Sequence, residues 1–417
     1  MYDLNPPHVF VHKRVFANKK ATARLERMLQ GLKNPPYEEV DESDTERIIE
    51  ASGAREELPV QSGRVRQGIE KLSSDPIMLF NTFVWNPDDV KKPPIQYGNP
   101  RARSIAQHMY GAGRNFAYSR RELADGRDPK RSYVCQGGWG IHTIEGCVHK
   151  CDYCTQSYFV SYMLDLEAFV VDLETHFGER PHQKVYRYDL KSDAICFEPE
   201  YGASELLGAC FSRNDRYLLV YTKSNNVEHL LDLPYKQHMP CYWTLATDTQ
   251  SISIERDTPT LDERLAAMRQ CADAGYVVRA GFSPIIPHLD WRREATVALE
   301  KLFAAVKPDT VRLWVVSMML ASEAEQIFGA ENLDPEFLQL MRQSALEMDG
   351  KHSGPFPQVR SEIYAHYIDE IKRISPGTPV NLCTEERQIW DMLTDPLEMS
   401  PDHLFCSCGQ FSVPEPV

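Results

Sequence analysis

The sequence predicts an α/β protein built on a parallel sheet that closes into a complete or partial barrel. Two observations carry this prediction. Over roughly 190 residues from residue 131 onward, short apolar runs alternate with helical runs, which is typical of parallel strands joined by crossover helices. The chain also has 417 residues, enough for one large α/β barrel with additions at both ends.

Residues 1–130 are predicted to form an N-terminal α/β extension and a connector. The run VFVHKRVF at residues 9–16 predicts a short strand, and ATARLERMLQGLK at residues 21–33 has the apolar spacing of an amphipathic helix. Residues 84–99 are rich in proline and residues 113–131 in basic side chains. Both stretches therefore predict connecting segments with solvated surfaces.

Residues 131–335 are predicted to form the barrel core. Its strand-like runs are AICFEPE, RYLLVYTKS, CYWTLATD, VVRAGFSPII and TVRLWVVSM, and its helical runs include LDERLAAMRQCADAGY and REATVALEKLFAAV. Parallel barrels carry their functional groups in the loops that follow the strands, so we expect the site there. Residues 336–417 are predicted to add helices, a strand and helix in PVNLCTEERQIWDML, and a coil that contains cysteines.

Composition narrows the classes of function. The chain has 46 Lys and Arg against 60 Asp and Glu, a formal charge of −14, which disfavours duplex DNA as a partner but leaves room for a local basic groove. No apolar run reaches the length of about 18 residues that spans a bilayer, and the start of the chain does not resemble a secretory signal. We expect a soluble, cytoplasmic protein with no membrane partner, whose cysteines are thiols or metal ligands.

Three cysteines lie close together in GCVHKCDYCT, residues 146–155. Cys147, Cys151 and Cys154 follow the spacing C-x3-C-x2-C. A structural zinc site needs four ligands, and His149 lies too close to two of the cysteines to complete one without straining the loop. An iron–sulfur cluster with three cysteine ligands instead leaves one iron free to bind another group. We favour the cluster, and the alternative of another class is a zinc or iron–sulfur protein without catalytic activity.

This spacing, with Tyr153 before the last cysteine and a strand-like segment ahead of the first, resembles the radical S-adenosylmethionine superfamily. The resemblance implies a partial (β/α)6-type TIM barrel and a four-iron four-sulfur (4Fe-4S) cluster held by Cys147, Cys151 and Cys154. It also implies that S-adenosylmethionine binds the open iron. One-electron reduction, by a flavodoxin-like or ferredoxin-like partner, then cleaves it to a 5′-deoxyadenosyl radical that takes hydrogen from a substrate.

Over most of its length the chain is also similar to the spore photoproduct lyase family. The similar segments are VFVHKRVFANKKA, LLVYTKSNNVEHLLDL, YWTLATD, IERDTPTLDERLAAMRQCADAGYVV and GFSPIIPHLDW, while NLCTEERQIW resembles relatives of the lyase. The resemblance implies that Lys223 binds the methionine carboxylate of S-adenosylmethionine and that Tyr153 contacts the adenine through its backbone. It further implies cofactor contacts from Ser204, Thr244 and Ser283.

The chain departs from this family where the DNA-repair lyase has a cysteine that donates hydrogen to the product radical. The matching segment here is FEPEYGASE, residues 197–205, with Tyr201 and Gly202 at that position, and Thr155 replaces a family tyrosine. We consider Tyr201 as a replacement donor that lines the substrate cavity. Cys196, just upstream, is the second candidate, although alternation along a strand would turn it to the opposite face.

These observations predict a radical S-adenosylmethionine enzyme that abstracts hydrogen from a nucleoside, nucleotide or other small metabolite. Acidity and the missing cysteine favour such a substrate over duplex DNA. Within the same enzyme class, the alternative is DNA repair of a methylene-bridged thymine dimer by a lyase whose hydrogen donor lies elsewhere.

Cys406 and Cys408 form a weaker candidate site, with Cys383 some distance before them. Two neighbouring thiols on an extended tail can be inert in a reducing cell. The functional alternatives are ligation of a second metal, or a hydrogen or electron relay at the active site.

Overall fold

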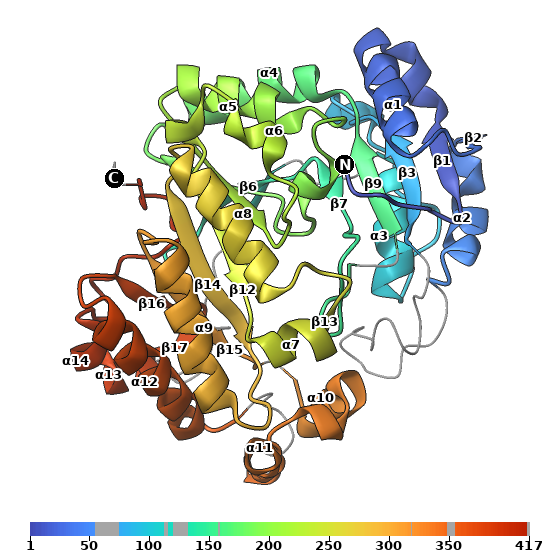
Figure 1. Cartoon of the computed structure of the whole chain (residues 1–417). Coiled ribbons are helices and arrows are strands. Elements are labelled where there is room, and N and C mark those ends of the chain that lie inside the picture. Colours follow the sequence, from blue (N-terminus) through green and yellow to red (C-terminus); the bar gives the residue numbers. More distant parts are fainter. Residues whose placement is uncertain are drawn as a thin grey trace.

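The computed structural model describes residues 1–54, 75–111, 116–119, 132–156, 159–317, 319–347 and 355–414. An eight-stranded sheet lies at the centre of the molecule (Figure 1). In spatial order its strands are β16 (Val380–Leu382), β15 (Val311–Val315), β14 (Val278–Ile285), β12 (Cys241–Leu245), β11 (Tyr217–Thr222), β10 (Val185–Tyr188), β6 (Gly138–Ile141) and β4 (Phe116–Ser119). Neighbours run parallel except β4 with β6. Among the described residues the edge strands β16 and β4 do not pair with each other, so the sheet is a partial barrel, as predicted.

Helices connect the parallel strands and cover the outer face of this sheet (Figure 1). They are α5 (Ala203–Arg213), α6 (Glu228–Leu231), α8 (Leu261–Asp273) and α9 (Trp291–Ala305), while α7 (Asp248–Ser253) lies beyond the carboxyl end of β12. Helix α8 begins in a capping box between Thr260 and Glu263. Its residues Leu261, Leu265 and Met268 recur at helical spacing and are buried. Each such leucine, fully buried, stabilises the fold by about 1.5–3 kcal/mol.

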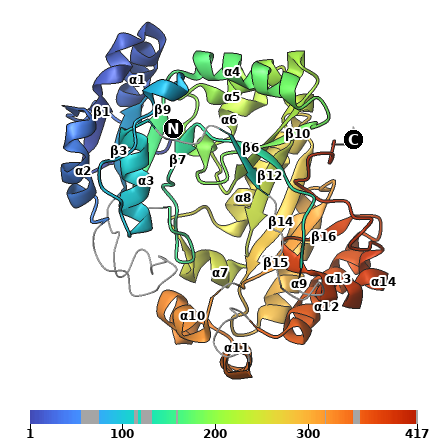
Figure 2. The same cartoon turned by 180° about the vertical axis from the view of Figure 1, so that it is seen from behind.

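A five-stranded sheet places the N-terminal region beside the barrel (Figure 2). Its spatial order is β2 (Glu38–Val40), β1 (Val9–His12), β3 (Ile77–Asn81), β9 (Phe159–Met163) and β7 (Ile144–Glu145). The helices of the N-terminal region are α1 (Lys19–Gly31), α2 (Thr45–Ala51) and α3 (Pro100–Met109), whereas α4 (Leu166–Glu179) follows β9 and packs beside α5 of the barrel. Because β3 pairs with β9, strands of the predicted extension and the predicted core share one sheet. The division of the chain after residues 130 and 335 stays a prediction.

The C-terminal region adds helices and one strand to the barrel. The helices are α10 (Ala321–Phe328), α11 (Pro335–Glu347), α12 (Pro357–Ile374), α13 (Arg387–Met392) and α14 (Thr394–Leu397). The strand is β16, which pairs in parallel with β15. Residues 405–414 form a coil, as predicted, although much of it is buried. No described helix is both long enough and apolar enough to cross a membrane.

The segment AICFEPE, predicted as a strand, is not one. Ala194–Phe197 forms a buried 3₁₀ turn, and the strand of this unit is β10, which ends earlier at Tyr188. All four residues of the turn are buried, and apolar content alone does not distinguish a buried turn from a buried strand. The argument from strand alternation therefore does not apply to Cys196.

Candidate functional site

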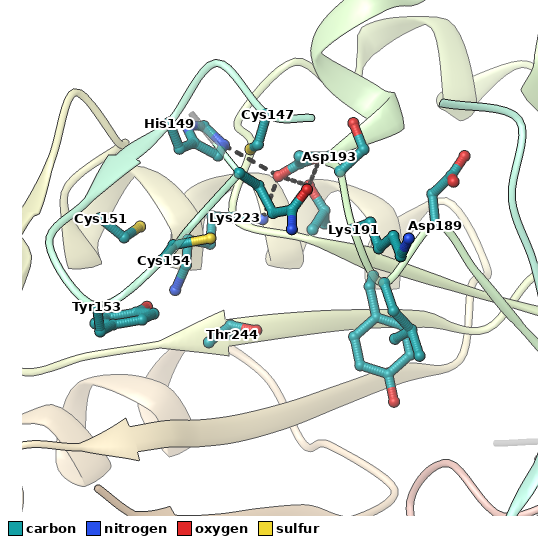
Figure 3. A pocket seen from close by; sticks show the side chains of 15 residues that line it. Cys147, His149, Cys151, Tyr153, Cys154, Asp189, Lys191, Asp193, Lys223 and Thr244 are labelled. Atoms are coloured by element: carbon teal, nitrogen blue, oxygen red, sulfur yellow. Dashed lines mark hydrogen bonds and ion pairs between the residues drawn. The ribbon is translucent and has the colours of Figure 1, made fainter. Parts of the chain in front are cut away.

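A cavity of about 160 Å³ opens at the carboxyl ends of β10, β11 and β12 (Figure 3). Residues 189–193 follow β10 and line one side, and Lys223 follows β11. Thr244 lines the cavity from near the end of β12. The cavity therefore lies where a parallel barrel is expected to carry its functional groups.

The cysteine loop, residues 147–154, forms another side of the cavity. Cys147, Cys151 and Cys154 all line it (Figure 3). The N–H of Cys154 donates to the carbonyl of Cys151 at 2.9 Å, which tightens the end of the loop. Cys151 lies in β8 (Lys150–Cys151), which pairs antiparallel with β13 (Glu255–Arg256). The three thiols are thus held on one short loop that is fastened to the segment after β12.

The spacing and chemistry of these thiols fit a cluster better than a single ion. A tetrahedral zinc site with bonds of about 2.3 Å places its sulfurs about 3.8 Å apart. Across the described ranges, the only group with three ligand atoms within 4.8 Å of one another is His149, Asp193 and Cys196, so the three loop cysteines are spaced more widely than one ion requires. Burial raises the pKa of the Cys151 thiol to about 12, and a bound metal supplies the positive charge that a thiolate there needs.

Lys223 is held at the edge of the cavity by the buried carboxylate of Glu255. The Lys223 ammonium lies 3.1 Å from Glu255 Oε2, and Arg264 lies 2.7 Å from the same oxygen. The hydroxyl of Tyr153 donates to Glu255 Oε1 at 2.7 Å. Burial acts to raise the pKa of Glu255, but Lys223 and Arg264 outweigh it and hold the pKa at about 2. Glu255 is therefore an anion that positions both a cation and an aromatic ring beside the cysteines.

Asp193 joins three segments around the cavity. It accepts hydrogen bonds from the hydroxyl of Thr222 at 2.9 Å and from the backbone N–H of Lys223 at 2.7 Å. His149 of the cysteine loop lies with Nε2 3.1 Å from Asp193 Oδ2 and with Nδ1 3.1 Å from the carbonyl of Asp257 (Figure 3). The loop after β10, the end of β11 and the cysteine loop are thereby fixed to one another.

The structure brings together some of the predicted site residues. Tyr153, Lys223 and Thr244 line the cavity together with the three cysteines. Sequence reasoning missed Glu255 and Asp193, which position them. The only available signal was the placement of Glu255 in IERDTP, a segment that resembles the family, because nothing in a linear sequence shows which distant cations surround a carboxylate.

Ser204 and Ser283 do not line this cavity. Ser204 is buried at the start of α5, where its hydroxyl donates to Glu198 Oε1 at 3.1 Å. Ser283 lies within β14 and not at its carboxyl end. The resemblance to the lyase family implies that Ser283 stands at a cofactor-facing strand end, and the structure corrects this, because β14 continues to Ile285. Cofactor contacts of these two serines stay predictions.

The two candidate hydrogen donors also lie outside the cavity lining. Tyr201 is fully buried, and its hydroxyl faces the carbonyls of Thr143 at 3.1 Å and Met163 at 2.8 Å. The expectation that Tyr201 lines the cavity is therefore corrected: its phenol is enclosed by backbone acceptors. Cys196 lies behind the cysteine loop, buried, with its sulfur 3.5 Å from His149 Nε2. A catalytic role of either residue stays a prediction.

The arrangement of a three-cysteine loop at the end of a parallel barrel has a counterpart among known families. Residues 136–321 match the spore photoproduct lyase family. The match confirms the family resemblance and the enzyme class that the sequence predicts, and it agrees with the expected 4Fe-4S cluster and S-adenosylmethionine. No curated protein sequence matches the chain.

Solved structures of spore photoproduct lyase share the fold of this chain. One, a double mutant with bound AdoMet and dinucleoside spore photoproduct, matches with a TM-score of 0.60 and 15% identity over 91% of this chain and 99% of that chain. Another, complexed with dinucleoside spore photoproduct, matches with a TM-score of 0.58 and 14% identity over 91% and 99% of the two chains. These likenesses extend beyond the matched family region to nearly the whole chain.

Proposed function

We propose that this protein is a radical S-adenosylmethionine lyase that acts on a methylene-bridged thymine pair. The observation that carries the proposal is the joining of the cysteine loop, Lys223 and Thr244 around one cavity at the carboxyl ends of barrel strands. The two solved structures described above that hold dinucleoside spore photoproduct support this substrate over the nucleoside, nucleotide or other small metabolite that the sequence favoured. The proposed substrate is therefore a methylene-bridged thymine pair in a dinucleotide, either free or within DNA.

The residues around the cavity have distinct roles in this proposal. Cys147, Cys151 and Cys154 hold the 4Fe-4S cluster, which supplies the electron that cleaves S-adenosylmethionine. Lys223 binds the carboxylate of the methionine moiety, since it is a cation at the cavity edge whose own position is fixed by Glu255. An electron-transfer protein of the flavodoxin or ferredoxin class is the expected reductant.

Anaerobic reconstitution with iron and sulfide tests the proposal. The protein is incubated with S-adenosylmethionine, a one-electron reductant and dinucleoside spore photoproduct as the probe substrate. We expect a brown protein with four irons per chain, conversion of the probe to two free thymidines, and formation of 5′-deoxyadenosine. Chromatography with mass detection measures each.

Two variants control this experiment. Cys151→Ala removes a proposed ligand and should lose the cluster and all products, whereas Cys210→Ala removes a buried thiol of α5 away from the cavity and should lose neither. If the native protein cleaves S-adenosylmethionine but leaves the probe intact, the substrate is a different molecule. A colourless protein that holds zinc and cleaves nothing overturns the enzyme assignment.

A further inference from the structure

The C-terminal coil carries Cys406 and Cys408 into the interior of the barrel. Arg279, in β14, donates to the carbonyls of Ser407 at 2.6 Å and Ser412 at 3.0 Å. Cys406 and Cys408, called here the thiol pair, are only 6% and 7% exposed. The coil is therefore an ordered part of the barrel and not the extended tail that the sequence suggested.

The thiol pair lies against charged and aromatic side chains of the barrel strands. The sulfurs of Cys406 and Cys408 are 3.8 Å apart. Arg312 of β15 donates to the sulfur of Cys408 at 3.7 Å and to the hydroxyl oxygen of Tyr221 at 3.2 Å. Its guanidinium also stacks over the ring of Tyr242, 4.4 Å from the centroid.

The two thiols differ in their affinity for a proton. The hydrogen bond from Cys406 and the charge of Arg312 lower the pKa of Cys408 well below its usual value, although burial opposes them. The same hydrogen bond raises the pKa of Cys406. Within the pair these shifts favour the proton on Cys406 and the negative charge on Cys408, whose sulfur accepts from Arg312 at 3.7 Å. Such a pair can give up a proton and an electron together.

Tyr221 connects this pair to the cavity. Of the two tyrosines that line the cavity, Tyr153 donates to Glu255, whereas Tyr221 hydrogen-bonds with Cys408 and accepts from Arg312. A carbon radical formed in the cavity must receive a hydrogen atom before the product can leave. Phenol and thiol groups hold the hydrogen atoms that side chains release most readily.

We infer that the thiol pair delivers a hydrogen atom, through the hydroxyl of Tyr221, to a carbon radical in the cavity. The inference rests on the proposed radical function and adds a path for its final step. The donor differs in place from both sequence candidates, Tyr201 and Cys196, which the structure encloses outside the cavity.

Bonds, protons and electrons balance in this step. A C–H bond forms as the O–H bond of Tyr221 breaks. The resulting phenoxyl radical takes an electron from the Cys408 thiolate, and the proton of the Cys406 thiol reaches its oxygen through the sulfur of Cys408. The two sulfurs then share one bond and one excess electron. The oxidised cluster that Cys147, Cys151 and Cys154 would hold would accept that electron, and a Cys406–Cys408 disulfide would remain. A dithiol, such as dithiothreitol, reduces the disulfide by exchange and is itself oxidised.

Cleavage of S-adenosylmethionine in D₂O, without any other substrate, tests the path. The probe is S-adenosylmethionine itself, because its radical takes hydrogen from the nearest donor when no substrate is present. O–H and S–H hydrogens exchange with solvent, whereas C–H hydrogens do not. We expect most of the 5′-deoxyadenosine from the native protein to carry one deuterium, and Tyr221→Phe to lower that fraction at least fivefold. Tyr276→Phe, which removes a buried phenol that donates to the Leu230 carbonyl outside the cavity lining, should keep the native fraction.

Cys408→Ser separates the two parts of the path. Without the thiolate, the phenoxyl radical of Tyr221 is not reduced, so we expect a tyrosyl radical signal in electron paramagnetic resonance and about one deuterated product per chain. In the native protein without dithiol, peptide mass analysis should find the Cys406–Cys408 disulfide. Cys271→Ala, at a second buried thiol pair formed with Cys241, should behave as the native protein does.

The outcomes distinguish this inference from the function on which it rests. 5′-Deoxyadenosine without deuterium in the native protein overturns the path and leaves the radical function standing. An unchanged deuterium fraction in Tyr221→Phe also overturns it. Absence of 5′-deoxyadenosine both in this experiment and with dinucleoside spore photoproduct, in a native protein that holds its cluster, overturns both. Ultraviolet absorption of the protein without cofactors detects a thiolate. If this absorption is lost in Cys408→Ser but kept in Cys271→Ala, the negative charge lies on Cys408, as the inference requires. If it persists in Cys408→Ser, the inference is contradicted.

Discussion

Glu255 lies at the centre of a buried ion cluster, with its Oε2 3.1 Å from Lys223 Nζ. Glu255 and Arg264 have no exposed side-chain surface, and Lys223 is 13% exposed. In such a place, removing one charge leaves the others without compensation, and the cost far exceeds that of a surface pair. The ion cluster therefore links the stability of the fold to the position of a cofactor-facing lysine.

Glu255→Gln should destabilise the protein strongly. Loss of the carboxylate leaves Arg264 and Lys223 as buried cations, and we expect a loss of about 3–5 kcal/mol in the free energy of unfolding. Denaturant unfolding followed by circular dichroism measures it. Asp3→Asn, which breaks an exposed pair with Lys33, is the matched control and should change stability by less than about 0.5 kcal/mol. Equal losses of unfolding free energy in the two variants would contradict the description of Glu255 as the centre of a buried ion cluster.

The same carboxylate predicts a loss of stability in acid. The folded-state pKa of Glu255 is about 2, below its usual 4.5, so its contribution to stability is fully present above pH 4.5 and is lost as the pH falls from about 4.5 towards 2. The difference corresponds to about 3 kcal/mol. Unfolding of the protein without its cluster, compared at pH 5 and pH 3, should show a steeper decline for the native chain than for Glu255→Gln. If the unfolding free energy of the native chain and of Glu255→Gln fell equally between pH 5 and pH 3, the acid sensitivity would come from groups other than Glu255.

Lys223→Met should weaken S-adenosylmethionine binding without removing iron. A hydrogen bond to a charged group contributes about 1.5–3 kcal/mol, so the dissociation constant should rise about tenfold or more. Equilibrium dialysis with the reconstituted protein measures the affinity, and iron analysis shows that the cluster remains. Lys184→Met, at an exposed lysine paired with Asp215, should bind as the native chain does. An unchanged affinity in Lys223→Met would remove the lysine from the cofactor site.

Tyr201→Phe should affect stability more than chemistry. The hydroxyl of Tyr201 faces two buried backbone carbonyls, and its removal leaves them without this donor, at a cost of about 1–3 kcal/mol. Formation of 5′-deoxyadenosine should continue at the native rate at a temperature where the variant is folded. If the folded variant still formed 5′-deoxyadenosine but no longer released the repaired product, Tyr201 would again be a candidate hydrogen donor.

The elements with a clear period could be predicted from the sequence. Strands such as β11 and β12 are apolar runs between turn residues. The cysteine loop can be recognised from the spacing of its three cysteines alone. Lys223 and Thr244 could be placed because they follow or end such runs, where a parallel barrel exposes side chains. All of these features depend on residues that are close together in the sequence, so the pattern of residue types is enough to predict them.

The features that could not be predicted depend on contacts between distant segments. The run at residues 194–197 is as apolar as a strand but forms a turn, because the strand of that unit ends six residues earlier at Tyr188. Glu255 acquires its role from Lys223 and Arg264, which come from two other elements. Cys406 and Cys408 look like a solvated tail until Arg279 and Arg312 are placed beside them.

The seating of the C-terminal coil also sets the order in which the molecule can be completed. Gln410 accepts hydrogen bonds from the N–H groups of Lys184 and Val185 at the start of β10, and Arg279 reaches Ser407 across 128 positions of sequence. A nascent chain therefore leaves the starts of β10 and β14, the amino-terminal rim of the barrel, uncovered until residues 405–412 have been synthesised. Removal of residues 404–412 by a protease would reopen that rim, and limited digestion at the C-terminus should unfold strands that were synthesised long before.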